Sequence, residues 1–196
     1  TLPDSNKGTL VLANNEALGS PSTARIVAIG SGGTLALDGG VSLADPNNRL
    51  EVILNGTGDS RLFPVNGALV SMNGTNTVPC KITLTNNTQF ASAKRLVLQG
   101  MVNGGARTLT LAGPGETALA GLNGMITNVS SITVISNGTL VLANTVLSNR
   151  PDRIINTIPV TLAGGGLGFS HDGGAANFSE TLGALTVSAG TNTVFA

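Results

Sequence analysis

One segment that occurs twice without change constrains the fold of this chain most. Gly8-Thr9-Leu10-Val11-Leu12-Ala13-Asn14 returns as Gly138-Thr139-Leu140-Val141-Leu142-Ala143-Asn144, and a Ser-Asn pair lies just upstream of both copies. Looser versions occur at Gly33-Thr34-Leu35-Ala36-Leu37, Arg107-Thr108-Leu109-Thr110-Leu111 and Gly183-Ala184-Leu185-Thr186-Val187. A short apolar strand repeated between Gly- and Asn-rich turns is typical of a β-solenoid, whose repeats bury their apolar faces against one another.

Pairs of apolar residues two positions apart recur along the chain. Side chains alternate between the two faces of a strand, so each pair predicts a short strand with one apolar face. The pairs are Leu10/Leu12, Leu35/Leu37, Ile82/Leu84, Leu96/Leu98, Leu109/Leu111, Ile132/Val134, Leu140/Leu142, Val160/Leu162 and Leu185/Val187. Gly and Asn tolerate positive φ, so clusters of them predict corners between the strands. These clusters are Ser31-Gly32-Gly33, Asp38-Gly39-Gly40, Asn55-Gly56, Asn73-Gly74, Asn103-Gly104-Gly105, Asn123-Gly124, Gly164-Gly165-Gly166 and Asp172-Gly173-Gly174.

The same alternation and the Asn-Gly turns also fit the hairpins of a β-sandwich. Two observations favour the solenoid. Near-identical segments are expected where rungs stack, and the chain has no Trp, no Tyr and only 5 Phe with which to build an aromatic core. We therefore predict an all-β parallel β-helix with short strands and Gly/Asn-rich corners. Its corner Asn and Thr side chains could form ladders between rungs.

The two identical copies lie too far apart to be successive rungs. Their separation predicts a multi-rung module that starts over near Ser136. No linker and no change in composition separates the modules, so residues 1–196 are expected to form a single continuous solenoid. We expect it to be part of a longer chain or assembly. The stretch from Asp45 to Phe63 fits no repeat.

Composition excludes several classes of function. Charged residues make up 10% of the chain, against roughly 25% in ordinary soluble domains, and 10 basic residues balance 10 acidic ones. Without a Lys/Arg cluster we expect no nucleic-acid partner. No apolar run approaches the ~20 residues of a spanning helix, so we predict no transmembrane segment. Cys80 is the single cysteine, which excludes an intrachain disulfide, and we interpret it as a small apolar residue beside a strand.

The order of the short motifs resembles a known family. The stretch from Ser5 to Ser20, with Gly-Thr-Leu followed by Ala-Leu-Gly, is similar to the autotransporter-associated β-strand repeat proteins. Further similar segments are 66–77, 82–84, 109–113 and 178–185, so the resemblance covers nearly the whole chain. It implies a right-handed parallel β-helix in a secreted or surface-displayed bacterial protein, where the repeat serves export and folding of a passenger. The membrane barrel of a complete autotransporter is not in this sequence.

Two segments invite a catalytic or metal-binding interpretation. Ser170-His171-Asp172 contains the residue types of a hydrolase triad, but adjacent residues of an extended segment point to opposite faces. We interpret His171 as a corner residue. The segment from Gly164 to Asp172 is faintly similar to the calcium-binding nonapeptide of β-rolls, but Asp172 comes late and no second copy exists. We expect neither metal nor cofactor.

The acidic residues and the sequons complete the candidates. Paired carboxylates would suggest a polysaccharide-cleaving β-helix. None of the acidic residues recurs at a spacing that predicts two on one face, although a solenoid can bring distant residues onto neighbouring rungs. They are Asp4, Glu16, Asp38, Asp45, Glu51, Asp59, Glu116, Asp152, Asp172 and Glu180. Asn-x-Ser/Thr sequons occur at Asn55, Asn73, Asn86, Asn128, Asn137 and Asn177.

We therefore expect a structural extracellular or cell-surface protein and no enzyme. It would be a passenger-like β-helical stalk or filament building block that associates end to end or laterally with β-helices of its own kind. No catalytic, cofactor-binding or metal-binding residue is assigned. The alternative is an adhesin that binds surface glycans, and a polysaccharide-cleaving enzyme is a third, less favoured hypothesis.

Overall fold

The computed structural model describes residues 7–19, 22–61, 65–173 and 178–196 and shows a parallel β-solenoid of about 7 turns. Each full turn of the coil crosses three faces, which we call face one, face two and face three. Face one contains β1 (Gly8–Leu12), β3 (Gly33–Leu37), β5 (Leu69–Ser71), β8 (Thr88–Ser92), β14 (Val160–Ala163), β16 (Leu185–Val187), and the second halves of β10 (Met101–Ala112) and β12 (Met125–Ile135).

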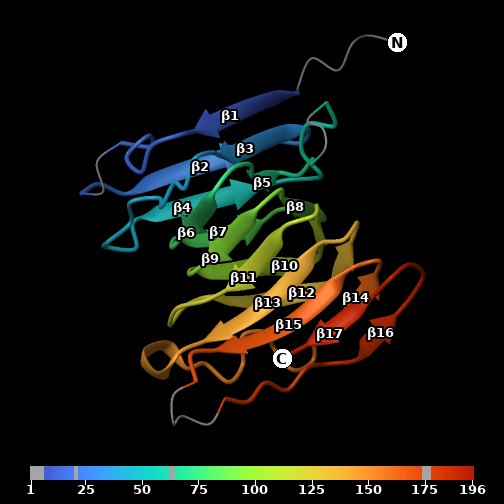
Figure 1. The fold of residues 1–196 in the computed structure, drawn as a ribbon. Coiled ribbons are helices and arrows are strands. Elements are labelled where there is room, and N and C mark those ends of the chain that lie inside the picture. Colours follow the sequence, from blue (N-terminus) through green and yellow to red (C-terminus); the bar gives the residue numbers. More distant parts are fainter. Residues whose placement is uncertain (1–6, 20–21, 62–64, 174–177) are drawn as a thin grey trace, which may run out of the picture.

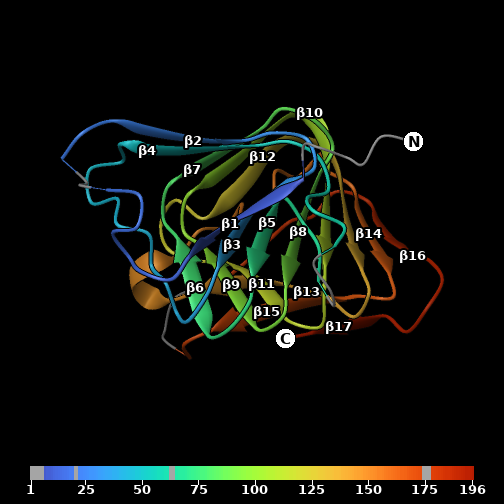
Figure 2. The same cartoon turned by 90° about the horizontal axis from the view of Figure 1, so that it is seen from above.

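Face two follows face one along the chain and forms a sheet of its own. Its six strands are β6 (Thr75–Val78), β9 (Arg95–Leu98), β11 (Glu116–Leu119), β13 (Thr139–Asn144), β15 (Gly166–His171) and β17 (Thr193–Phe195). Face three contains β2 (Arg25–Ile29), β4 (Leu50–Leu54), β7 (Lys81–Leu84) and the first halves of β10 and β12. Figure 1 shows the strands stacked from β1 at one end to β16 and β17 at the other. Figure 2 shows β2, β4 and β7 along one side of the coil and β6, β9 and β11 along another.

All strand pairs in the described part of the chain are parallel. This confirms the solenoid over the hairpins of a β-sandwich. All nine predicted apolar pairs lie in strands. No α-helix occurs among the described residues, and the one short helix is the 3-10 turn η1 (Val146–Ser148). Nothing helical in this part is long and apolar enough to cross a membrane. The right-handed sense of the coil stays a prediction.

The core consists of columns of side chains that run along the axis of the coil. In a parallel coil, equivalent residues of successive turns lie directly above one another. One column on face one runs through Leu10, Leu35, Leu69, Phe90, Leu111, Val134, Leu162 and Val187. Its six inner members are at most 1% exposed, whereas Leu10 and Val187 at its ends are 45% and 60% exposed. The column is therefore open at both ends.

Face two also packs tightly on its outer side. One outward column runs through Val97, Ala118, Val141, Gly168 and Phe195, so large and small residues alternate. A Cβ atom at Gly168 would lie 2.5 Å from Cζ of Phe195, which is why the ring can lie over this position only if it is glycine. Val97, Ala118 and Val141 are each below 9% exposed.

A long excursion covers the outer side of face one. Its described parts are residues 55–61, which follow β4, and residues 65–68, which precede β5; Val65 packs on a stripe of small residues that includes Ala36 and Ala91. Gly58 has φ +78°, and a Cβ atom there would lie 1.9 Å from the carbonyl oxygen of Gly67. This excursion accounts for the part of the stretch from Asp45 to Phe63 that follows β4, although Phe63 itself lies outside the described residues. Its strand, β4, occupies a regular position in face three.

The two identical segments lie on different faces of the coil. The first copy forms β1 of face one, and the second forms β13 of face two. Leu140 and Leu142 are buried as predicted. Val141 lies on the outer side of its strand and is 4% exposed, because it belongs to the packed outer column of face two. In the first copy Leu12 is buried, whereas Leu10 is 45% exposed because no strand of the described chain covers the first turn. Val11 is 50% exposed on the first turn.

Candidate functional site: the two open ends of the coil

The N-terminal end presents strands that have a partner on one side only. Among the described strands, β1 pairs with β3 alone and β2 with β4 alone. Leu10, Val11 and Ile26 are 45%, 50% and 68% exposed. Open strand edges with apolar side chains are the usual template for adding another strand. On face two this end presents a turn over residues 14–18 in place of a strand.

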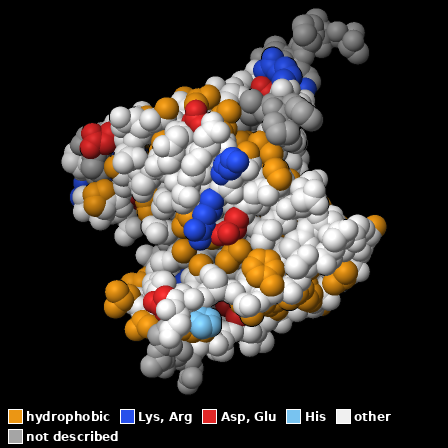
Figure 3. All heavy atoms as spheres, viewed as in Figure 1, with side chains coloured by type: hydrophobic (Ala, Val, Ile, Leu, Met, Phe, Trp, Pro, Cys, Tyr) orange, Lys and Arg blue, Asp and Glu red, His pale blue; other side chains and the backbone are white. Residues whose placement is uncertain are grey.

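The C-terminal end has the same character. β16 pairs with β14 alone, and β17 pairs with β15 alone, within the described chain. Leu185, Val187, Val194 and Phe195 are 42% to 60% exposed. Figure 3 shows hydrophobic side chains gathered toward this end of the molecule.

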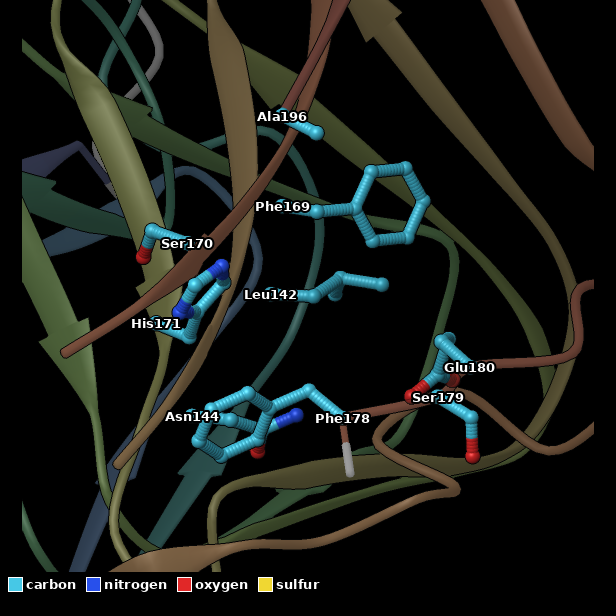
Figure 4. A pocket seen from close by; sticks show the side chains of 9 residues that line it. All are labelled: Leu142, Asn144, Phe169, Ser170, His171, Phe178, Ser179, Glu180 and Ala196. Atoms are coloured by element: carbon cyan, nitrogen blue, oxygen red, sulfur yellow. The ribbon is translucent and has the colours of Figure 1, made fainter. Parts of the chain in front are cut away.

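A hollow of about 440 Å³ opens at the C-terminal end between the last turns. Leu142 of β13 and Phe169 of β15 point into it, and Ser179 and Glu180 lie across from them (Figure 4). His171 stacks on Phe178 with ring centroids 5.0 Å apart. The hollow is lined by residues of β13 and β15 and by the segment 178–180.

A buried arginine holds the longest corner of the coil in place. Arg153 is 0% exposed, and its Nε donates to Asn144 Oδ1 at 2.8 Å. Its Nη1 donates to the carbonyl oxygens of Gly121 and Gly124, and its Nη2 to that of Ser148. Burial lowers the pKa of Arg153 to about 10, so the guanidinium remains a cation at neutral pH. These bonds tie together two corner loops that would otherwise leave backbone carbonyls unsatisfied.

Glu180 joins this network from the next turn. Its carboxylate accepts from the backbone N–H groups of Arg153 and Ile154, both at 3.0 Å. Burial raises the pKa of Glu180 above its ordinary value, and the two backbone donors offset part of this shift. The carboxylate of Glu180 occupies the position at which the carbonyl groups of a further strand of face three would accept these two hydrogen bonds.

The structure does not bring Ser170, His171 and Asp172 together as a triad. Asp172 accepts from the backbone N–H of Val146, and His171 Nδ1 accepts from that of Gly173 at 3.0 Å. His171 is the last residue of β15, in register with Asn144, and the turn that it was predicted to occupy begins after it. In the described ranges, no group of three or more His, Cys, Asp and Glu side chains is arranged to hold a metal ion. The first glycines of the calcium-like segment donate their N–H groups to Asn192 Oδ1.

Most other acidic side chains have structural partners. Ion pairs join Asp59 to Arg61 at 2.7 Å, Glu51 to Lys81 at 2.9 Å, and Glu116 to Arg95 at 2.9 Å. The bonds from Arg61 lower the pKa of Asp59 to about 2. Asp45 accepts from two backbone N–H groups, and Asp38 accepts from Asn73. Asp4 lies outside the described residues. The other acidic residues weighed above are Glu16 and Asp152.

Cys80 lies beside a strand as predicted, directly before β7. Cys80 is 1% exposed, and burial raises the pKa of its thiol to about 12, which makes it a poor nucleophile. Four of the sequon asparagines, Asn73, Asn86, Asn128 and Asn137, are exposed and Asn55 is half-buried. Asn177 lies outside the described residues.

Sequence reasoning missed Arg153 and Asn76. Asn76 is 0% exposed, its Oδ1 accepts from the N–H groups of Gly40 and Val41, and its Nδ2 donates to Ser71 Oγ. Asn76 lies inside β6, so it is not one of the predicted corner asparagines. A step of the predicted kind joins Asn128 Nδ2 to Oδ1 of Asn103, one turn earlier, at 3.2 Å. The one signal for Arg153 was its place beside Arg150 and Asp152 in a chain that is otherwise poor in charge.

No family model, no curated protein and no solved structure matches this chain. The fold is therefore defined by the structure itself, as a parallel β-solenoid of about 7 turns. Its most distinctive surfaces are the two ends of the coil.

Proposed function

We propose that the chain is a non-catalytic structural protein, a stretch of β-solenoid that extends, displays or assembles at the outside of a bacterial cell. It would serve as a passenger-like stalk or filament building block, as its resemblance to the autotransporter-associated β-strand repeat proteins implies. Low charge and many Thr, Ser and Asn residues support an exported protein.

The observation that carries the proposal is the continuous column from Leu10 to Val187. Residues in contact along it are equivalent from turn to turn, so each turn adds length to the same core, while insertions such as the excursion over face one lie outside it. A spacer needs this property, because its length is set by the number of turns. Each turn adds about 4.8 Å along the axis.

Removing one turn tests this proposal. Deletion of residues 88–108 joins Asn87 to Leu109, which lies in register with Thr88. This deletion leaves Gly121 and Gly124, the partners of Arg153, in place. We expect this variant to keep its β-sheet circular dichroism and its cooperative unfolding, and to be shorter by about 4.8 Å in small-angle X-ray scattering. The matched control deletes residues 88–109. That one extra residue turns every following side chain of the strand to the opposite face, so the control should fail to fold.

A result in which both deletions unfold alike would contradict a modular spacer. Location is tested separately: an antibody against the chain should label intact cells of the source organism. Labelling only after the cells are opened would contradict an exposed surface protein.

A further inference from the structure

The two ends of the coil carry complementary strands on face one. β1 lies at one end and β16 at the other, and each has one open edge within the described chain (Figure 1). Both run in the same direction around the coil, because they belong to one parallel sheet. A strand of a second chain could therefore pair with the open edge of β16 in the same way as β16 pairs with β14. β1 runs in the direction that this pairing requires.

The residues of the two strands continue the same columns. Val187 ends the apolar column that Leu10 begins. A second row of equivalent residues begins at Thr9, opposite Thr34. At the other end of the coil the same row passes through Thr133 and Thr161 and ends at Thr186. A second chain placed on the C-terminal end in this register brings Val187 against Leu10 and Thr186 against Thr9.

The third position of the pair matches in size. Leu185 is 42% exposed, and in this register it lies over Gly8. A Cβ atom at Gly8 would meet nothing within 4 Å, so the leucine side chain has room there. A large residue over a small one is the same alternation that fills the outer column of face two.

We propose that β16 of one copy pairs in parallel with β1 of a second copy, so that this chain binds head to tail to itself. The inference rests on the proposed function, since it names the partner with which the spacer assembles. The contact joins two different surfaces and no symmetry closes it, so repeated addition gives a linear fibre. The other two faces contribute less, because face two meets the turn over residues 14–18 and the segment 178–182 is not a strand.

Two blocked variants test the proposal. Leu10→Lys blocks only the N-terminal end, and Val187→Lys blocks only the C-terminal end. Both side chains are half exposed or nearly so, and a lysine can keep its ammonium in water, so both variants should fold. The control is Leu147→Lys, on a residue that is 90% exposed in η1 at the side of the coil.

Sedimentation velocity across a concentration series gives the readout. The wild-type chain and Leu147→Lys should form a ladder of linear oligomers, and each blocked variant alone should raise the association Kd at least roughly tenfold, because a charge is placed in the apolar junction. An equimolar mixture of the two blocked variants should form one-to-one dimers and stop there, since one intact end of each remains.

Three results would overturn the proposal: a wild-type chain that stays monomeric, blocked variants that still form fibres, or a mixture that forms no dimer. Loss of association in Leu147→Lys would assign the contact to the side of the coil and overturn it too. These outcomes are separate from the turn-deletion test. A chain that tolerates loss of a turn yet stays monomeric would keep the spacer and lose the head-to-tail contact.

Discussion

Glu180 accepts a hydrogen bond from the backbone N–H of Arg153 at 3.0 Å through Oε2, one turn of the coil away. Its other carboxylate oxygen accepts from the N–H of Ile154, also at 3.0 Å. Ile154 is the last residue of face three that bridges back to the preceding turn, at Ile126. A side chain thus replaces the strand that would otherwise satisfy these donors, and the C-terminal turn is fastened by a titratable group.

This arrangement predicts that the turn fastened by Glu180 is more stable in mild acid, because protonation removes the cost of burying its charge. Burial raises the pKa of Glu180 above its ordinary value of 4.5. A carboxyl whose pKa is raised in the folded state adds stability that is complete below the unfolded value and is lost as the pH rises through the folded value. We expect the free energy of local opening at Ile154, measured by hydrogen exchange corrected for intrinsic rates, to fall as the pH rises from about 4 to about 7.

Glu180→Gln should abolish this pH dependence, because its amide does not titrate in this range. Glu16→Gln is the control, since Glu16 is exposed at the opposite end of the chain. A wild-type opening energy that rises with pH, or a slope that survives in Glu180→Gln, would assign the effect to another group.

Arg153→Met should destabilise the chain by roughly 3 kcal/mol. The methionine fills a similar volume but leaves the carbonyls of Gly121 and Gly124 without the donor that Arg153 supplies. Urea unfolding followed by far-ultraviolet circular dichroism gives the difference. Arg95→Met, which breaks the exposed ion pair with Glu116, should cost less than about 1 kcal/mol. Equal losses in the two variants would show that Arg153 has no special structural role.

Asn76→Leu tests whether a corner can do without its buried amide. Leu96 occupies the equivalent position one turn on, so leucine fits the strand itself. The substitution leaves the N–H groups of Gly40 and Val41 without an acceptor, and we expect a loss of about 2 kcal/mol in urea unfolding. Asn87→Ala, at an exposed amide that accepts one bond from Thr108, should cost less than about 0.5 kcal/mol. A neutral Asn76→Leu would contradict the role assigned to the amide.

Gly58→Ala should detach the excursion over face one. The new methyl group would overlap the carbonyl oxygen of Gly67, so the backbone must move. Gly39→Ala is matched, because Gly39 also has positive φ but open space around its Cβ position. We expect about 1 kcal/mol from backbone strain in the control and at least about 2 kcal/mol for Gly58→Ala, with faster hydrogen exchange in β5 and β8. The same loss in both variants would mean that strain alone, without overlap, explains the effect.

The strands with two inward apolar residues could be predicted from the sequence, because their alternation is a local signal. β6, β8 and β11 gave a weaker signal, since Asn76, Thr88 and Thr117 occupy inward positions and are buried with polar partners or beside the core. Their burial follows from the register of neighbouring turns, which no local pattern contains.

The network around Arg153 could not be predicted for a similar reason. Its partners Gly121 and Glu180 are brought to it by two different turns of the coil. The open ends were anticipated in general terms, because a solenoid has strand edges at both ends. That β1 and β16 belong to the same columns became evident only once the register of every turn was known.

The placement of the two identical segments on different faces has a consequence for how such a gene can change. Recombination between the two copies would join β1, the first strand of face one, to the corner that follows β13 of face two after Asn144. The product would be out of phase by part of a turn, and its later strands would meet the wrong faces. Lengthening or shortening by exchange between these copies is therefore disfavoured, and a whole turn is gained or lost only where the exchange joins residues in register, such as Leu109 and Ile132.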